Sequence, residues 1–129
     1  MKRKDGVTPI RIILVEDQAD FRRLMKAMLA RQPDLEVVAE AGSLAEARKV
    51  TDAVNFDVAI LDLGLPDGHG ADLIAELRRL NPGVRVLILS ATLDPTNIEK
   101  ASDARADEIM DKFSPLEEVL GTVRRLADI

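Results

Sequence analysis

Four short apolar segments constrain the fold of this chain more than any other feature of its sequence. They are rich in β-branched residues, and they are continuous rather than alternating: Ile10–Val15, Leu35–Ala39, Val58–Leu61 and Val84–Leu89. Continuous apolar runs are typical of strands that are covered on both faces, as in a parallel sheet. With a weaker fifth segment at Glu108–Met110, they predict five central strands.

The segments between these runs have the period of amphipathic helices. After the first, third and fifth strands, apolar residues recur at intervals of three and four, which predicts a helix with one buried stripe in each place. The stripes are Phe21, Leu24, Met25, Met28 and Leu29; Leu73, Ile74, Leu77 and Leu80; and Leu116, Val119, Leu120, Val123 and Leu126.

Two helix starts have the spacing of a capping box. Ser43 precedes Glu46 by three positions, and Ser114 precedes Glu117 in the same way. Pro115 suits the first position of the second of these helices, because the missing N–H of proline costs little there. We therefore expect the two helices to begin directly after these serines.

The helix expected between the fourth and fifth strands is the least anchored element. Asp94-Pro95 is a helix start, and the helix runs from Thr96 to about Asp103. It offers only Ile98, Ala101 and Ala104 to a core, so we expect it to be easily displaced.

The order of elements is therefore a strand and a helix repeated five times in 129 residues, a length that fits one domain. Right-handed crossovers then give an α/β fold, an open, doubly wound parallel sheet with helices on both faces. We expect this domain to span residues 10–129, after an N-terminal tail of residues 1–9.

Composition excludes several classes of function. Lys and Arg number 18 and Asp and Glu 23, and the resulting net charge of −5 disfavours nonspecific binding to nucleic acid or to an anionic membrane. The absence of cysteine excludes disulfides, thiolate metal sites and a cysteine nucleophile. The early apolar run Ile12–Val15 is too short for a signal peptide, so we expect a cytoplasmic protein. The basic stretch Lys2-Arg3-Lys4 is too short to indicate a binding arm.

Chemically active residues follow four of the five predicted strands. Glu16 and Asp17 follow the first strand, Asp62 the third, Ser90 the fourth and Lys112, after a short gap, the fifth. The carboxyl ends of parallel strands share one edge of the sheet, where ligands bind near the switch point in strand order. We therefore expect three acids, a hydroxyl and an amine to lie together.

Such a cluster needs positive charge. Two carboxylates about 4 Å apart repel by roughly 4 kcal/mol at an effective dielectric constant of 20. Lys112 supplies one positive charge, and a hard divalent cation such as Mg²⁺ suits the remaining oxygen ligands. Because Mg²⁺ beside a free carboxylate also binds phosphate oxygens, the cluster predicts phosphoryl transfer, with Asp62 as nucleophile and Ser90 and Lys112 contacting the phosphoryl group.

Each of these residues alone also has an ordinary structural role. Asp17 and Asp62 are candidates for helix caps or turns, a serine at a strand end often bonds the backbone, and a single lysine is usually solvated. His69, in the loop after Asp62, is either a proton donor near the site or an exposed loop residue. What favours a site is that the acids, the serine and the lysine occur together at the ends of four strands.

In these features the chain resembles the receiver domains of bacterial two-component response regulators, the CheY-like family. The resemblance runs from Ile10 to Ile129 and is carried by Val15-Glu16-Asp17, Leu61-Asp62-Leu63-Gly64-Leu65-Pro66 followed by Gly70, Leu89-Ser90-Ala91, and Lys112. It implies a flavodoxin-like (βα)5 fold with strand order 2-1-3-4-5. It also implies that a sensor histidine kinase or a phosphotransfer protein phosphorylates Asp62, and that the domain is a conformational switch and not an enzyme.

The resemblance implies individual roles as well. Asp17 and Asp62 would ligate Mg²⁺, with Glu16 acting through water and the carbonyl of Gly64 as a further ligand. The face built from the fourth helix, the fifth strand and the fifth helix would contact a downstream target or an output domain, in a monomer or a phosphorylation-dependent dimer. Since the last helix should end near Ile129, the chain is either a stand-alone receiver or the receiver part of a longer regulator.

Three departures from the family pattern affect the switch. Ile109 stands where the family commonly has Tyr, Phe or His, so the switch positions Ser90 and Ile109 lack the usual aromatic gate. Arg105 and Glu108 occupy positions where glycine is frequent, so we expect a different shape in the loop before the fifth strand. Phe113 replaces a frequent proline after the lysine, and we expect a trans bond there, because cis without proline costs roughly 2.5–4 kcal/mol.

Two other functions share parts of this pattern. A Mg²⁺-dependent phosphohydrolase that forms an aspartyl phosphate would use the same residues, but position 64, where a common aspartyl-phosphatase motif has a second acid, is glycine. A flavodoxin-like cofactor binder would need a glycine-rich phosphate loop and an aromatic residue to stack a flavin, and the chain has no Tyr or Trp. The prediction is therefore a phosphoacceptor domain, with the phosphohydrolase as the alternative.

Overall fold

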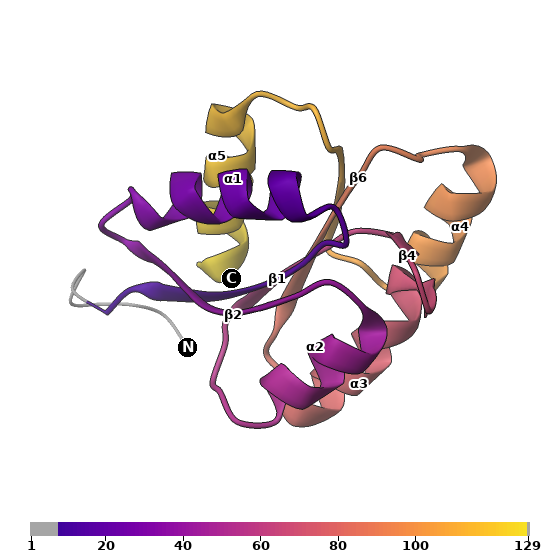
Figure 1. Ribbon diagram of the computed structural model, residues 1–129, viewed down its shortest axis with the longest axis horizontal. Helices are drawn as coiled ribbons and strands as arrows, with labels where there is room; N and C mark the ends of the chain where they lie inside the picture. The colour runs from indigo at the N-terminus through magenta and orange to yellow at the C-terminus, as the bar shows by residue number, and fades with distance from the viewer. Residues whose placement is uncertain (1–7, 129) are drawn as a thin grey trace.

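The computed structural model describes residues 8–128, in which five parallel strands form the central sheet (Figure 1). The strands are β1 (Ile10–Val15), β2 (Leu35–Ala41), β3 (Val58–Leu61), β6 (Arg85–Ser90) and β7 (Glu108–Asp111). Their order across the sheet is β2-β1-β3-β6-β7, and every neighbouring pair is parallel. This is the predicted order 2-1-3-4-5. The predicted tail, residues 1–9, lies outside the described residues except for Thr8 and Pro9, as does its basic stretch Lys2-Arg3-Lys4.

Helices cover both faces of the sheet, as predicted. Figure 1 shows α1 and α5 on one face and α2 and α3 on the other. The helices of the described residues are α1 (Ala19–Ala30), α2 (Leu44–Thr51), α3 (Ile74–Leu80), α4 (Pro95–Asp103) and α5 (Leu116–Ala127).

The apolar runs of the strands are continuous because each strand faces a core on both sides of the sheet, as inferred from the sequence. In β1, Ile12 and Leu14 pack with residues of α1 and α5, whereas Ile13 and Val15 pack with residues of α2 and α3. Burial of a side chain of this size contributes about 1.5–3 kcal/mol. A polar residue at any of these positions would face a core and not solvent.

Several predicted boundaries shift by one or two residues. β2 continues to Ala41, and β6 ends at Ser90 itself. The capping box predicted at Ser114 and Glu117 is wrong: α5 begins at Leu116, and its N-cap is Pro115, which makes no side-chain cap. The reason is that the N–H of Ser114 donates to the carbonyl of Asp111 at 3.0 Å and so belongs to the turn leaving β7. At the other predicted box, the hydroxyl of Ser43 does accept the N–H of Glu46, at 3.1 Å.

Three residues expected on buried stripes are exposed. Leu24 is 55% exposed, Leu80 49% and Ile98 41%. The apolar stripe of each helix is wider than the face that the sheet covers, so its edge reaches solvent. In α4 only Ala101 is buried, which agrees with the expectation that this helix is weakly anchored.

A short hairpin after β3 has no counterpart in the sequence prediction. It pairs β4 (Gly64–Leu65) with β5 (Gly68–His69) in antiparallel fashion, and a 3-10 turn, η1 (Gly70–Leu73), leads from it into α3. The carboxylate of Asp67, at the tip, accepts the N–H groups of Leu44 and Ala45 at 2.8 and 3.0 Å. The hairpin is thereby fixed to the N-terminus of α2.

Candidate functional site

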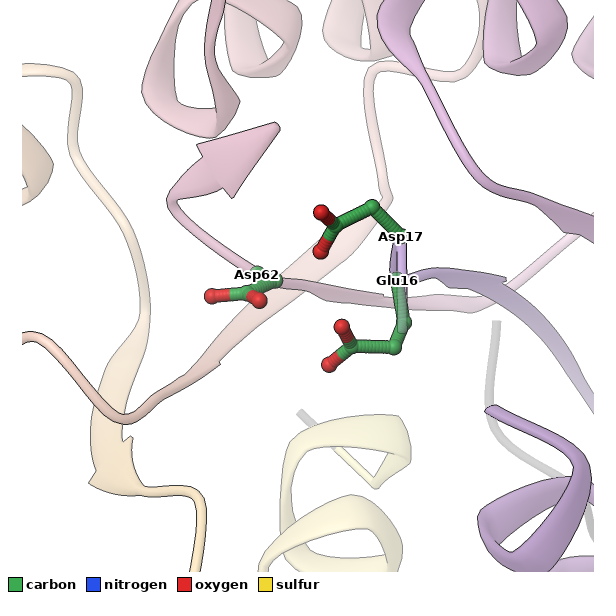
Figure 2. A group of neighbouring side chains, drawn as sticks. All are labelled: Glu16, Asp17 and Asp62. Carbon is green, nitrogen blue, oxygen red and sulfur yellow. The ribbon is translucent and has the colours of Figure 1, made fainter. Parts of the chain in front are cut away.

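The ends of β1 and β3 bring three carboxyl groups together, as the topology predicts. Val15 pairs with Leu61 in the sheet, and the N–H of Asp62 donates to the carbonyl of Val15 at 2.9 Å. Figure 2 shows Glu16, Asp17 and Asp62 on the adjoining strand ends with their carboxyl groups directed to the same side. One carboxylate oxygen from each residue lies within 4.8 Å of the others.

The three acids differ in their access to water. Glu16 is 2% exposed and Asp62 8%, whereas Asp17 is exposed. Their donor atoms are all carboxylate oxygens, with no nitrogen or sulfur among them. This donor set fits a hard divalent cation such as Mg²⁺, which prefers oxygen ligands and keeps part of its water shell. The exposed side of the cluster, at Asp17, leaves access for that water.

Lys112 supplies the positive charge expected at this edge. Its Nζ lies 2.7 Å from Oε1 of Glu16 and 3.7 Å from Oδ2 of Asp62, and the residue is only 4% exposed. The ammonium also donates to Oε1 of Gln18 at 2.9 Å and lies 4.5 Å from the ring centroid of Phe21. The segment entering α1 and the first turn of α1 therefore fix the position of a lysine that follows the last strand.

One positive charge does not balance the cluster. Burial raises the pKa of Glu16 above its usual range, and the negative charge of Asp62 adds to this effect. Hydrogen bonds from Lys112 and from the N–H of Gln18 lower the pKa of Glu16 but do not cancel the effect of burial. A second cation near these carboxylates would therefore be stabilised.

Ser90 lies at the same edge but bonds to its own loop. It is fully buried, and its Oγ lies 3.2 Å from Oγ1 of Thr92 and accepts the N–H of Thr92 at 3.3 Å. The N–H of Lys112 donates to the carbonyl of Ser90 at 2.9 Å, which ties the ends of β6 and β7 together. A contact of the Ser90 hydroxyl with a phosphoryl group on Asp62 stays a prediction.

The remaining predicted positions lie around the cluster. Gly64 is exposed at the start of β4, two residues beyond Asp62, and the role of its carbonyl stays a prediction. Ile109 is half-buried in β7 beside Ile88. The bond before Phe113 is trans, as expected, and Phe113 is 76% exposed. Arg105 has φ 67°, the left-handed conformation that glycine favours, so here an arginine adopts a glycine conformation.

Three residues that take part in the site's contacts were not predicted from the sequence. Gln18 and Phe21 hold the ammonium of Lys112, and Asn97 of α4 contacts His69 at 2.9 Å. Phe21 belongs to an apolar helical stripe, which predicts burial and not a contact with a cation. No spacing rule connects Gln18 or Asn97 to the acids, because the contacts arise only from the packing of separate elements.

Within residues 8–128, none of the helices combines the length and the apolar character that crossing a bilayer requires.

Comparison with known protein families gives one match over most of the chain. The family model of the response regulator receiver domain matches residues 12–124. The chain is 36% identical over 120 residues to protein-glutamate methylesterase/protein-glutamine glutaminase 1 of Caulobacter vibrioides, an alignment that covers 93% of this chain and 34% of that protein. The chain spans only part of the curated relatives that it matches: for three of them it covers 34%, 38% and 54% of their length.

Solved structures show the same fold. The signal receiver domain of the response regulator NarL from Mycobacterium tuberculosis superposes with a TM-score of 0.85 at 29% identity, covering 93% of this chain and 97% of that one. A response regulator from Burkholderia pseudomallei, solved with a phosphorylated aspartic acid, a calcium ion and citrate, superposes with a TM-score of 0.80 at 25% identity. That alignment covers 92% of this chain and 68% of that one.

Proposed function

The chain belongs to the response regulator receiver family, and from this premise we propose that Asp62 accepts a phosphoryl group in a Mg²⁺-dependent reaction. The observation that carries the proposal is the meeting of three carboxylates and one buried ammonium at a single sheet edge. The Burkholderia relative, whose structure holds a phosphorylated aspartic acid and a divalent cation, supports it.

Asp17 and Asp62 would ligate the Mg²⁺, with Glu16 acting through water and Gly64 through its carbonyl. When bound, the cation neutralises part of the carboxylate charge and binds phosphate oxygens. The protein holds the carboxylates at a separation at which they repel one another, so the site is ready for a cation before any ligand arrives.

In the transfer itself, a carboxylate oxygen of Asp62 attacks phosphorus. The bond from phosphorus to the donor atom breaks, and the leaving group keeps the electron pair. Lys112, whose Nζ lies 3.7 Å from Oδ2 of Asp62, would hold a phosphoryl oxygen through its charge. Ser90 would donate a hydrogen bond from its hydroxyl group to another phosphoryl oxygen, once that hydroxyl group has left Thr92.

The domain acts in signalling, and its partners follow from the family. We propose a sensor histidine kinase or a phosphotransfer protein as the phosphoryl donor, and a downstream target or output domain at the face of α4, β7 and α5. We further propose that the chain works in the cytoplasm as a monomer or a phosphorylation-dependent dimer, and that it catalyses no reaction beyond gain and loss of its own phosphoryl group. We do not propose the phosphohydrolase, because position 64, where a common aspartyl-phosphatase motif has a second acid, is glycine.

Intact mass spectrometry after incubation with acetyl phosphate tests this proposal. With Mg²⁺ we expect the mass of one phosphoryl group to be added, and with EDTA little or none. The variant Asp62→Asn should gain no such mass, whereas Asp72→Asn, which changes an exposed acid of η1, should behave like the parent. An unchanged parent mass, or equal gain in Asp62→Asn, would contradict the proposal. Many equivalents of phosphoester hydrolysed per protein would indicate the phosphohydrolase instead.

A further inference from the structure

We propose that a hydrogen-bonded link between His69 and Asn97 holds α4 in place until phosphorylation and then releases it. The link joins the hairpin that follows Asp62 to the helix that follows Ser90. The inference rests on the proposed function of Asp62 and names the route by which a phosphoryl group there reaches α4.

The bonding pattern fixes which atom of each side chain takes part. Nδ1 of His69 accepts the N–H of Ala71 at 3.2 Å, so in the neutral imidazole the proton is on Nε2. Nε2 therefore donates to Oδ1 of Asn97, at 2.9 Å. The amide group of Asn97 then has its Nδ2 free to donate to the carbonyl of Thr92, at 2.7 Å. All three contacts agree with one tautomer and one amide orientation.

These bonds continue to the phosphorylation site through Thr92. Its N–H and hydroxyl bond to the hydroxyl of Ser90, and its carbonyl holds Asn97. If Ser90 turns its hydroxyl toward a phosphoryl group on Asp62, it draws the backbone of Thr92 with it. The carbonyl of Thr92 then moves away from Asn97, and the bond to His69 loses its support. This route uses hydroxyl, amide and imidazole groups and does not involve Ile109.

The two ends of the link differ in how firmly they are held. The hairpin carrying His69 is fixed at its tip, because the carboxylate of Asp67 accepts two N–H groups of α2. In addition, the backbone of His69 is paired with that of Gly64 within the hairpin. On the other side, α4 buries only Ala101. A helix with one buried side chain depends strongly on polar contacts at its N-terminus, so loss of the link moves α4 and leaves the hairpin in place.

Two substitutions of His69 separate its two hydrogen bonds. In His69→Asn, the shorter amide places an oxygen where Nδ1 was, so it can still accept the N–H of Ala71 but does not reach Asn97. In His69→Gln, the longer amide places a donor where Nε2 was, so it keeps the link to Asn97 and loses the hydrogen bond from the N–H of Ala71. The two variants are therefore matched controls for each other, and thermal unfolding checks that both are folded.

We would measure amide hydrogen exchange in α4, with and without acetyl phosphate and Mg²⁺, together with the rate of mass gain. In the parent and in His69→Gln, phosphorylation should speed exchange in the first turns of α4. In His69→Asn, exchange should already be fast, by about three- to tenfold, and phosphorylation should add less than twofold, since a hydrogen bond of ordinary strength is absent from the start. His69→Asn should also gain the phosphoryl group about three- to tenfold faster, which a merely structural role of His69 would not cause.

The outcomes distinguish the link from the function on which it rests. If the parent gains no phosphoryl group, the proposed function fails and the link fails with it. If the parent and both variants gain it equally fast, with equal changes in α4, the proposed function stands and the link is refuted. The link is also refuted if His69→Gln, and not His69→Asn, is the variant that exchanges fast.

Discussion

Glu16 illustrates how a residue that we propose to take part in cation binding lowers the stability of the fold when no cation is bound. Its side chain is almost fully buried, and burial raises its pKa above the usual value of 4.5. The folded protein therefore binds a proton at Glu16 more readily than the unfolded chain does. At neutral pH the ionised carboxylate thus lowers the free energy of unfolding relative to a neutral side chain.

From this we predict that Glu16→Gln raises the urea midpoint of the Mg²⁺-free protein at pH 7. The advantage should shrink as the pH falls through the folded pKa of Glu16 toward 4.5, because the parent then protonates as well. Added Mg²⁺ should stabilise the parent more than the variant, since the variant has lost a carboxylate near the cation. A variant that is less stable than the parent at pH 7 in EDTA would contradict this account.

Gly70 shows how a residue without a side chain shapes the site. A Cβ at this position would lie 1.9 Å from the carbonyl oxygen of Asp62, and backbone atoms cannot move aside as a flexible side chain can. We predict that Gly70→Ala lowers the free energy of unfolding by about 1–3 kcal/mol and slows phosphorylation. Denaturant unfolding and the rate of mass gain measure the two effects.

The matched control is Gly121→Ala, in the exposed part of α5, where an added Cβ meets no heavy atom within 4 Å. Here alanine should raise stability by about 0.5–1 kcal/mol, because it favours the helix more than glycine does. Equal effects of the two substitutions would show that the close approach to Asp62 does not matter.

Only some of the residues at the site could be predicted from the sequence. Glu16, Asp17 and Asp62 were predictable, because each directly follows a recognisable strand and the topology brings strand ends together. Gln18 and Asn97 were not, because a neutral amide carries no pattern, and its partner is decided by the packing of elements far apart in the chain.

At the scale of elements, the loop from α4 to β7 contains a backbone strain that the sequence indicates. Arg105 has φ 67°, and its N–H and that of Ala106 bond back to carbonyls of α4, at Ser102 and Ala101. Arg105 directly follows the C-cap of α4, Ala104. Glycine is the usual residue in a left-handed conformation at this position, because other residues meet a steric penalty there.

We predict that Arg105→Gly raises the free energy of unfolding by about 0.5–1 kcal/mol. Ala104→Gly, one position earlier and with a right-handed backbone, should lower it by at least a similar amount, because glycine adds flexibility there and removes a methyl group that packs against the core. Chemical denaturation of both variants provides the comparison. If Arg105→Gly is as destabilising as its neighbour, the left-handed conformation is not the source of strain.

Elements were predictable in proportion to their length and to the regularity of their pattern. The five sheet strands and the long helices follow from apolar runs and helical stripes, with boundaries wrong by one or two residues. The hairpin of β4 and β5 was missed because two-residue strands have no period to detect. The start of α5 was misplaced because Ser114 belongs to the turn that leaves β7, which no local spacing reveals.

At the scale of the whole molecule, paired carboxylates determine how the protein responds to acid. Ion pairs with Arg124, Lys26 and Arg48 lower the pKa values of Asp34, Glu40 and Glu76, respectively. The N–H groups of Ala45 and Leu44 lower the pKa of Asp67 in the same direction. A carboxyl whose pKa is lower in the folded protein contributes stability above its unfolded pKa, and this contribution is lost as the pH falls through the folded value.

We therefore predict that the free energy of unfolding decreases as the pH falls below about 4.5, the unperturbed value of the glutamates. Glu16, whose pKa is raised, adds stability as the pH falls, but it is a single group, whereas four carboxyl groups have lowered pKa values. Urea unfolding from pH 7 to pH 3 measures the slope, and Asp34→Asn should reduce it. Because these pairs are largely exposed, salt should reduce it as well. A stability that is constant or rising over this range would contradict the assignment of these pairs.

The fold of the molecule was more predictable than its switching. Topology follows from the order of strands and helices and from the right-handed crossover, which leave few arrangements to choose from. The coupling between the site and α4 depends on contacts of His69, Asn97 and Thr92, each of which is a common surface residue in the sequence. Such contacts become visible only after the elements are packed.

The most direct test of the account is to locate the phosphoryl group on the chain. Borohydride reduces an aspartyl phosphate at its carbonyl carbon and releases phosphate, which converts that aspartate into homoserine. After treatment with acetyl phosphate and Mg²⁺, reduction and peptide mass mapping should find homoserine at position 62 and unchanged aspartate at position 17. Homoserine at another position, or none in a protein that is shown to be folded, would contradict the central claim that Asp62 is the phosphoacceptor.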